Sequence, residues 1–431
     1  MPIRCGNAPR PWAAAFCVSI ALALPGAAPG AADAPVASDP VFTALTVDAR
    51  TVSGRIRQFG PAGDLTLVTV DGPEQVIPLG TLVKLSREMK RTREEDPAAQ
   101  TRKAGVVLFP DGDRLYRATI LSANETTLEV KPDNLDLLAV PLESLLGLIY
   151  REPPNPEVLG LPLGPDALEG LVQIVRTEPR TSEVVWLKNG DKLAGGFLSL
   201  GDKTVAIQPA KEPISLDLSG VVALGFDPSP VVYPKPDGPF LELTFENGSR
   251  LGVTGARVEE GHVLARTRFG TPIRVPIHEL TRVHARTRSV VYLTERTPAG
   301  ERYVPYVGPP RPYRRDATVD GHPMLLSGKE YDRGIGTQSR TLLAYRLEAG
   351  DKRFQAQVGL DDRAGPLGSV TFRVLVDNKE SFASPPMSSH DAPRPIDIDL
   401  SGSRSLILIT EFGERGGVRD LADWVEARII R

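Results

Sequence analysis

The sequence of 431 residues contains only two cysteines, Cys5 and Cys17, and both lie near its N-terminus. The remainder of the chain therefore has no disulfide and no thiol nucleophile, and its fold must rest on packed cores. Histidine is also scarce, because the chain has five, and none shows the HExxH pattern or another metal-ligand spacing. Neither a G-x-S-x-G elbow nor a phosphate-binding loop occurs. These absences leave zinc enzymes, thiol hydrolases and P-loop enzymes without support.

Long hydrophobic runs are missing after Leu24. Two arginines precede the apolar run that ends there, and small residues follow it, so cleavage is expected after Ala32 or Ala34. The run is shorter than the roughly 20 residues that a membrane-spanning helix needs. Residues 1–32 are therefore predicted to be a secretory signal peptide, and the product is expected in the periplasm or outside the cell, with no transmembrane segment.

No charge of one sign dominates the chain. Without the two arginines of the predicted signal peptide, 49 basic residues remain against 54 acidic residues, which gives a net charge of −5. A mildly acidic chain argues against nucleic acid as a partner. Forty prolines and forty glycines are spread without a period, which indicates many turns rather than a collagen-like or disordered chain.

Four nine-residue segments in the first two thirds of the chain align without gaps, each with apolar residues at positions one, three, six and nine. Three of them follow an Asp-Gly or Asn-Gly hairpin signal, and the apolar spacing predicts a strand, a turn and another strand. The segments span residues 77–85, 140–148, 216–224 and 275–283. We predict four β-meander repeats, at residues 41–86, 105–151, 183–227 and 239–288.

Each predicted repeat is similar in strand count to a small SH3-like or Sm-like barrel. A lone meander buries too little apolar surface to be stable, so the repeats are expected to pair or to stack. The spacers between them are uneven. Residues 86–105 are charge-rich and predict an exposed helix or loop, whereas Ala167 to Val175 has the spacing of a short amphipathic helix. Pro298 to Pro312 is proline-rich and is taken as the boundary before the last domain.

The last quarter of the chain, residues 302–431, alternates apolar and polar residues in several short runs. Examples are Phe354 to Gly359 and Ser369 to Val376, which are separated by turn residues. This alternation is what half-buried strands need, because successive side chains point to opposite faces. The region therefore predicts a β-sandwich, and the whole chain is expected to be all-β.

Four motifs in this region, in order and at matching spacing, resemble the NPCBM family of carbohydrate-binding modules that accompany glycoside hydrolase family 98 enzymes. They are Tyr331 to Thr337, Phe354 to Asp362, Gly368 to Asp377 and Asp420 to Trp424. The resemblance implies a jelly-roll-like sandwich that binds glycans. This chain departs from the family pattern at two positions where histidine is expected, and it carries Gln338 and Leu421 there.

The motifs supply the candidate carbohydrate-binding residues, which are Tyr331, Gln338, Asp361, Asp362, Asp420, Asp423 and Trp424. Two of these assignments have open alternatives. Trp424 either stacks on a sugar ring or packs in the core. Asp361 and Asp362 either accept sugar hydroxyls, hold a calcium ion, or cap turns by binding backbone N–H groups. No cofactor is predicted from the sequence, and calcium in the C-terminal domain is left open as the one alternative.

The function predicted from the sequence is that of an exported, non-catalytic protein that binds a glycan or a glycosylated surface. The repeats would then act as a spacer or as a platform for a protein partner. A glycoside hydrolase-related enzyme with an appended module, and an envelope protein whose module has lost its sugar, remain alternatives. Glu242 and Glu246 could form a catalytic carboxylate pair, but they alternate with Leu241 and Leu243, which predicts a solvated strand face.

Overall fold

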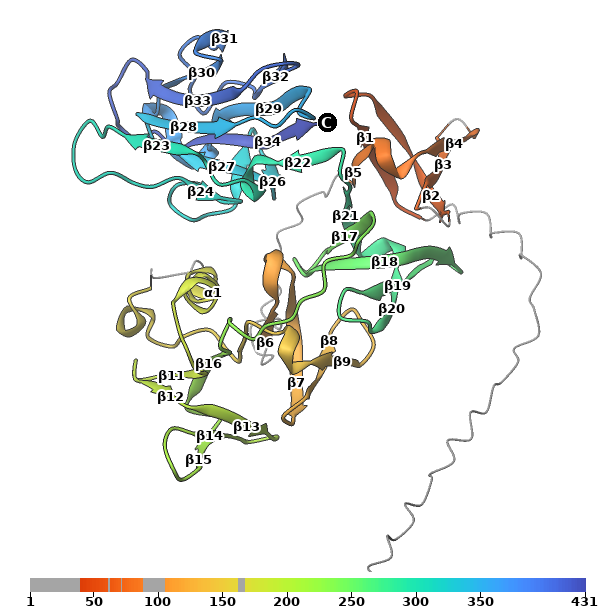
Figure 1. Ribbon diagram of the computed structural model, residues 1–431, viewed down its shortest axis with the longest axis vertical. Helices are drawn as coiled ribbons and strands as arrows, with labels where there is room; N and C mark the ends of the chain where they lie inside the picture. The colour runs from red at the N-terminus through yellow and green to blue at the C-terminus, as the bar shows by residue number, and fades with distance from the viewer. Residues whose placement is uncertain (1–38, 61–62, 71, 88–104, 162–166) are drawn as a thin grey trace, which may run out of the picture. The chain divides into compact units, whose positions relative to one another are not determined.

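The computed structural model describes residues 39–60, 63–70, 72–87, 105–161 and 167–431. The predicted signal peptide and most of the charge-rich spacer at residues 86–105 lie outside the described residues. The described residues are almost entirely strands and turns, which confirms the predicted all-β class (Figure 1). None of their helices has the length and apolar character needed to cross a membrane.

Each of the four predicted repeat ranges contains a meander of antiparallel strands, and its last strand returns to pair with its first. The strands of residues 41–151 are β1 (Val41–Thr46), β2 (Thr51–Phe59), β3 (Leu65–Thr69), β4 (Glu74–Ile77), β5 (Leu82–Ser86), β6 (Gly105–Leu108), β7 (Arg114–Ala123), β8 (Thr127–Pro132), β9 (Leu138–Pro141) and β10 (Gly147–Ile149). Those of residues 183–288 are β11 (Val184–Leu187), β12 (Lys192–Ala194), β13 (Gly196–Leu200), β14 (Thr204–Gln208), β15 (Ile214–Asp217), β16 (Val221–Gly225), β17 (Phe240–Phe245), β18 (Arg250–Glu259), β19 (His262–Thr267), β20 (Pro272–Pro276) and β21 (Leu280–Arg286).

The nine-residue segments form a strand, a tight turn and another strand, as their apolar spacing predicts. In three of them the turn is a 3-10 helix, at Leu79–Thr81, Leu142–Ser144 and Ile277–Glu279. A β-bulge explains why apolar residues occupy positions six and nine instead of six and eight. In repeats 1, 3 and 4 the ladder between the first and last strands skips position seven, and one extra residue moves the following side chains to the other face.

The repeats associate in two pairs, each through its last strands. Strand β5 pairs with β21 and places Leu85 opposite Val283, while β10 pairs with β16 and places Leu148 opposite Leu224. All four residues occupy position nine of their segments, so equivalent positions face each other across each antiparallel ladder. This is the arrangement of a two-fold symmetric interface, here built within one chain. The pairing lets each meander bury apolar surface that it could not bury alone.

One α-helix, α1 (Ala167–Thr177), lies in the part of the chain that the structure describes, at the place where the sequence predicts an amphipathic helix. Its buried residues include Leu171, Val172 and Val175, and these pack with Trp186 and Val222 of repeat 3 in a separate small core. The predicted spacing is confirmed, because residues three and four apart share one helix face.

The C-terminal region forms two packed antiparallel sheets and a hairpin. The first sheet has the order β24-β27-β34-β29-β32 with β22 added on β34, and the second has the order β23-β28-β33-β30-β31. The strands are β22 (Val290–Tyr292), β23 (Gly300–Tyr303), β24 (Arg314–Arg315), β25 (Met324–Leu326), β26 (Lys329–Tyr331), β27 (Gly334–Thr337), β28 (Thr341–Arg346), β29 (Arg353–Leu360), β30 (Val370–Val376), β31 (Lys379–Ala383), β32 (Arg394–Asp399), β33 (Ser405–Phe412) and β34 (Ala422–Ile430). The predicted sandwich is thus confirmed.

The sandwich begins earlier than the sequence suggests. Strand β22 pairs with β34, and β23 pairs with β28, so both belong to the sandwich although they precede residue 302 or overlap it. The stretch from Pro298 to Pro312 is therefore part of the domain and not a linker before it. The boundary was missed because β22 and β23 are only three and four residues long, too short to show alternation.

Strand β34 is buried along its whole length, which is unusual for a strand of a sandwich sheet. Its inner face carries Trp424 into the main core of the sandwich. On its outer face, Val425 packs with Met324, Leu326 and Tyr331 of the β25–β26 hairpin. The hairpin therefore covers part of the outer face and decides which motif residues reach solvent.

Candidate functional site

Four loops meet at one end of the sandwich, which we term the loop end. It consists of residues 304–312, 338–340, 361–369 and 413–421. The ladders bring these loops together, because Thr337 and Leu360 both lie opposite Ala422, where β27 and β29 end and β34 begins. In the other sheet, Val370 and Phe412 face each other at the same end. Six of the seven sequence-predicted residues lie in these loops or within three residues of them, and Tyr331 is the exception.

Asp420 lies at the centre of the loop end and is almost completely buried. Its carboxylate accepts a hydrogen bond from the hydroxyl of Ser339 and another from the backbone N–H of Ser369, at 3.1 Å. Burial raises the pKa of Asp420 to about 6, although both hydrogen bonds favour the charged form. Asp420 therefore ties three loops together and holds Ser339 in place.

Gln338 is half-buried beside Ser339, directly after β27. The backbone carbonyl oxygen of Gln338 accepts a hydrogen bond from the hydroxyl of Thr341 at 2.5 Å, which fixes the backbone of the loop. A side-chain amide carries both donors and acceptors, so this position can bind a hydroxyl-rich ligand. The structure thus places Gln338 and Asp420 together, linked through Ser339.

Leu421, the other departure from the family pattern, is buried in the sandwich core. The residue therefore contributes to packing and not to a polar surface.

Asp361 and Asp362 use their carboxylates to hold backbone turns. Asp361 accepts hydrogen bonds from the backbone N–H groups of Arg363 at 2.9 Å and Leu325 at 2.8 Å. Asp362 accepts from the N–H groups of Ser327 and Gly328, each at 2.8 Å, and so caps the turn of the β25–β26 hairpin. Of the alternatives that the sequence left open, turn capping is the one that these contacts support.

Asp423 is fully buried beneath the same hairpin, next to the carboxyl group of Asp361. Burial and the neighbouring carboxylate raise the pKa of Asp423 well above its usual range. A protonated Asp423 can donate a hydrogen bond to Asp361, which would satisfy both groups without a cation. Among the described residues, no group of three or more His, Asp or Glu side chains is arranged to hold a metal ion. A calcium requirement stays a prediction.

Trp424 and Tyr331 do not face solvent. The Trp424 ring packs edge-on against Phe372, with centroids 5.2 Å apart, and its indole N–H donates to the hydroxyl of Thr410 at 3.1 Å. The Tyr331 hydroxyl donates to Gln357 at 3.1 Å, and burial raises the pKa of Tyr331 to about 12. The sugar-stacking alternative for Trp424 is therefore wrong, because its ring has no exposed face.

An exposed aromatic residue at the loop end was missed by the sequence analysis. Tyr306 is 67% exposed, and its ring lies against Gly416 and edge-on to Phe412, with centroids 5.6 Å apart. A Cβ atom at Gly417 would meet the Cβ atom of Tyr306 at 3.0 Å and the hydroxyl of Ser339 at 4.0 Å, so Gly417 lies between Tyr306 and the buried Ser339. Tyr306 was overlooked because it lies in the proline-rich stretch that we took for a linker.

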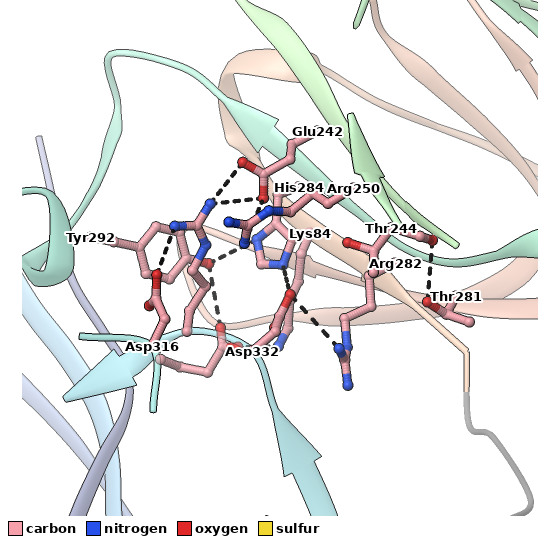
Figure 2. A network of polar contacts seen from close by, with 12 residues as sticks. Lys84, Glu242, Thr244, Arg250, Thr281, Arg282, His284, Tyr292, Asp316 and Asp332 are labelled. Atoms are coloured by element: carbon pink, nitrogen blue, oxygen red, sulfur yellow. Dashed lines mark hydrogen bonds and ion pairs between the residues drawn. The ribbon is translucent and has the colours of Figure 1, made fainter. Parts of the chain in front are cut away.

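A second polar cluster joins the sandwich to repeats 1 and 4 (Figure 2). The guanidinium of Arg333, after the β25–β26 hairpin, donates to both carboxylate oxygens of Glu242 in β17 at 2.7 Å, and it also contacts Asp316 at 3.2 Å. Burial alone would raise the pKa of Glu242, but Arg333 and Arg250 hold it well below its usual range. The carboxylate therefore remains charged in a buried ion pair.

A further ion pair and a histidine–aspartate contact complete this cluster. The ammonium group of Lys84 lies 2.6 Å from Glu426, and the imidazole of His284 lies 3.3 Å from Asp332. Tyr292 lies between the pairs, with its hydroxyl 3.3 Å from His284 and 3.4 Å from Glu426. Burial would raise the pKa of Asp332, but His284 and Arg282 lower it well below its usual range. The cluster matches positive and negative groups with one another, which is typical of a structural interface.

This cluster corrects our interpretation of Glu242 and Glu246. Glu242 is 3% exposed and buried against the sandwich, whereas Glu246 is exposed and pairs with Arg87 at 3.2 Å. Alternation along β17 correctly indicated that Glu242 faces away from the repeat core. The sequence did not show that another domain covers that face.

Comparison with known proteins places the sandwich in a family. Residues 291–430 match the family model described as the NPCBM/NEW2 domain. The C-terminal sandwich is an NPCBM/NEW2 domain. The match begins at β22, in agreement with the strand pairing, and it covers all the sandwich strands that follow.

Two curated proteins show similarity in sequence. One is named "Putative endo-alpha-N-acetylgalactosaminidase" from Renibacterium salmoninarum and is 26% identical over 159 residues, which cover 34% of this chain and 10% of that protein. The other is alpha-1,3-galactosidase B from Akkermansia muciniphila, 29% identical over 117 residues, which cover 26% of this chain and 15% of that protein. The chain thus spans only a small part of both relatives.

Solved structures of carbohydrate-binding modules are also similar. The family 51 module (CBM51) of a Clostridium perfringens GH95 protein, solved with methyl-galactose, is 26% identical, covers 32% of this chain and 99% of its own, and has a TM-score of 0.30. A CBM51-2 structure from Clostridium perfringens ZmpB, solved with GlcNAc, is 20% identical with a TM-score of 0.31, and covers 44% of this chain and 43% of its own.

Proposed function

We infer that this chain is an exported, non-catalytic protein that binds a glycan through the loop end of its NPCBM domain. The observation that carries the proposal is the exposed ring of Tyr306 at the same loop end as the half-buried Gln338, in a domain from a carbohydrate-binding family. Sugar C–H groups stack on aromatic faces, and their hydroxyls need nearby donors and acceptors.

In this proposal the residues have different roles. Tyr306 supplies the stacking face, and the side-chain amide of Gln338 binds hydroxyl groups. Asp420 is too deeply buried to touch a ligand, so it acts as a positioning residue that holds Ser339 and the loop of Ser369. One ring and few polar contacts support weak binding, in the millimolar to micromolar range, or about −4 to −8 kcal/mol.

The names of the two curated relatives suggest which sugars to test first. One is named for N-acetylgalactosamine linkages and the other for α-1,3-linked galactose. We propose that terminal sugars of this galactose-like configuration are the ligands of the loop end.

The environments of Glu242 and Glu246 support the non-catalytic part of the proposal. Glu242 is neutralised by Arg333 and buried, so it is not positioned to act as an acid or a nucleophile beside Glu246. Export is supported by the signal-peptide pattern of residues 1–32. The repeats would then serve as a rigid base for the domain, and a protein partner for them stays a prediction.

A glycan array probed with the full chain, with and without calcium, tests the proposal. We expect signal on glycans that end in galactose or N-acetylgalactosamine, loss of this signal in Tyr306→Ala, and retention in the matched variant Tyr306→Phe, which keeps the ring. Because Tyr306 is largely exposed, neither change should disturb folding. Silence of the folded wild-type chain on every glycan would refute glycan binding, and equal signal from wild type and Tyr306→Ala would place the site elsewhere.

A further inference from the structure

The exposed large apolar side chains of the sandwich are all gathered at the loop end. Within residues 290–431 there are four, namely Tyr306, Val307, Leu367 and Val418, and they are 67%, 81%, 49% and 47% exposed. Scattered single exposures are normal on a soluble protein, whereas a group on adjoining loops marks an interaction surface.

Contacts between the loops show that these side chains come from adjoining loops. We term the exposed surface of residues 304–312, 361–369 and 413–421 the rim. The ring of Tyr306 lies against Gly416, two residues before Val418. The guanidinium of Arg415 donates to the carbonyl of Pro366, which is next to Leu367. The loops of residues 304–312 and 361–369 therefore both contact the loop of residues 413–421, and the four exposed apolar side chains belong to these three loops.

Two arginines at this rim have no carboxylate partner among the contacts of the described residues. Arg415 binds the carbonyl of Pro366, and Arg419 binds the carbonyls of Ala364 and Arg363. Arg340, in contrast, is paired with Glu411 at 3.0 Å. Carbonyl groups orient the guanidiniums of Arg415 and Arg419 but do not neutralise them. The rim therefore combines exposed apolar side chains with two positive charges, beside the exposed carboxylate of Glu414.

We propose that the loop end docks on a lipid surface that carries anionic headgroups, with Val307, Leu367 and Val418 inserted between headgroups and Arg415 and Arg419 bound to phosphate. This role goes beyond glycan binding and does not depend on it. Valine and leucine have no aromatic face, so they are poor sugar ligands, but they partition readily into the acyl boundary of a bilayer. Arginines at such a boundary bind anionic lipid electrostatically.

Features of the structure favour this occupant over a second copy of the chain. Self-association through this rim would bring the same unpaired arginines against each other, and like charges across an interface repel. The rim also remains open within the chain. The contacts of the sandwich with repeats 1 and 4 use Arg333, Asp332 and Glu426, away from the strand ends that form the loop end.

Co-sedimentation of the full chain with vesicles tests the proposal. We expect binding to phosphatidylcholine vesicles that contain phosphatidylglycerol, much weaker binding to phosphatidylcholine alone, and weakening at high ionic strength. Replacing Val307 and Val418 by serine should lower the partition constant about tenfold for each residue. Replacing Arg415 and Arg419 by glutamine should lower it about fivefold for each at low ionic strength.

The matched control removes two exposed valines from repeat 1. Val70 and Val76 are 67% and 61% exposed, and Val70→Ser with Val76→Ser should leave vesicle binding unchanged. Failure of the wild-type chain to bind anionic vesicles would overturn the proposal, as would binding that the Val307 and Val418 substitutions do not affect. Sedimentation velocity without lipid adds a further check, because a dimer that dissociates in Val307→Ser would assign the rim to self-association instead.

Discussion

Replacing Glu242 by glutamine should loosen the contact between the NPCBM domain and the repeats. Glutamine has nearly the shape of glutamate but no charge, so the buried guanidinium of Arg333 would lose its two-oxygen partner, which accepts both hydrogen bonds at 2.7 Å. Breaking a buried pair by removing one charge costs about 3–5 kcal/mol, because the other charge stays buried. Since Asp316 still contacts Arg333 at 3.2 Å, we expect the lower end, about 3 kcal/mol.

Glu246→Gln is the matched control, four residues along the same segment. Glu246 pairs with Arg87 at the surface, and its side chain is 59% exposed. Exposed pairs contribute about 0–1 kcal/mol, so this variant should behave nearly as the wild type. The two substitutions remove the same charge from the protein, and any difference between them reports the burial of Glu242.

Native-state hydrogen exchange of the full chain measures the effect where it arises. The backbone N–H of Glu426 donates to the carbonyl of Arg333, so peptides that contain β27 and β34 report on this contact. A loss of about 3 kcal/mol corresponds to exchange faster by about 100-fold in these peptides. Equal exchange rates in Glu242→Gln and Glu246→Gln would refute the reasoning that this ion pair secures the domain.

Three further outcomes follow from the loop end and the sandwich core. The pKa of Asp420 is raised to about 6 in the folded protein, from about 4 in the unfolded chain. Between about pH 4 and pH 6 the folded state therefore binds more protons than the unfolded state, and the free energy of unfolding should fall as the pH rises through about 4 to 6. Asp420→Asn removes the charge, and its amide can accept from the N–H of Ser369 and donate to the hydroxyl of Ser339. It should remove this decline and raise the free energy of unfolding at pH 7 by about 1–2 kcal/mol, measured by urea denaturation across pH; an unchanged pH profile would contradict the assignment. Trp424→Ala should lower the free energy of unfolding by about 3–5 kcal/mol in the same assay, as expected for a core residue, and a stable variant that loses only glycan binding would restore the stacking role. Glycan binding should be insensitive to EDTA in the wild type and in Asp362→Asn, because the carboxylate of Asp362 already accepts hydrogen bonds from Ser327 and Gly328. Inhibition of wild-type binding by EDTA would show that a cation is required.

Local patterns in the sequence predicted the strands of the repeats, because meanders depend on contacts close in sequence. The apolar spacing of the nine-residue segments also indicates the bulge. Positions six and nine can face the same side of a strand only if the ladder skips one residue between them. Which repeats associate was not predictable. All four segments present equivalent apolar residues, such as Leu85 and Leu148, and nothing local distinguishes the observed partners from the alternatives.

The candidate site was predicted less well than the fold. Motif residues such as Trp424 and Asp423 are recognisable because the sandwich needs them, and for the same reason they are buried. Asp420 and Gln338 were named as candidates, but the sequence did not show that they converge; the pairing of Thr337 with Ala422 brings them to one end. Tyr306 could not be found in this way, since it lies in a loop without periodicity and is brought to the site only by its contact with Gly416.

The polar cluster between the sandwich and repeats 1 and 4 explains why the NPCBM domain should be studied within the whole chain. A fragment that starts at Arg302 would lack β22 and half of β23, leaving edges of β34 and β28 unpaired. It would also expose Arg333, Asp332 and Glu426 without the repeat residues that neutralise them. Poor folding of such a fragment would therefore say nothing about glycan binding. Since Asp332 and Arg333 belong to the motif that begins at Tyr331, this chain uses part of a family motif to fasten the domain to its repeats.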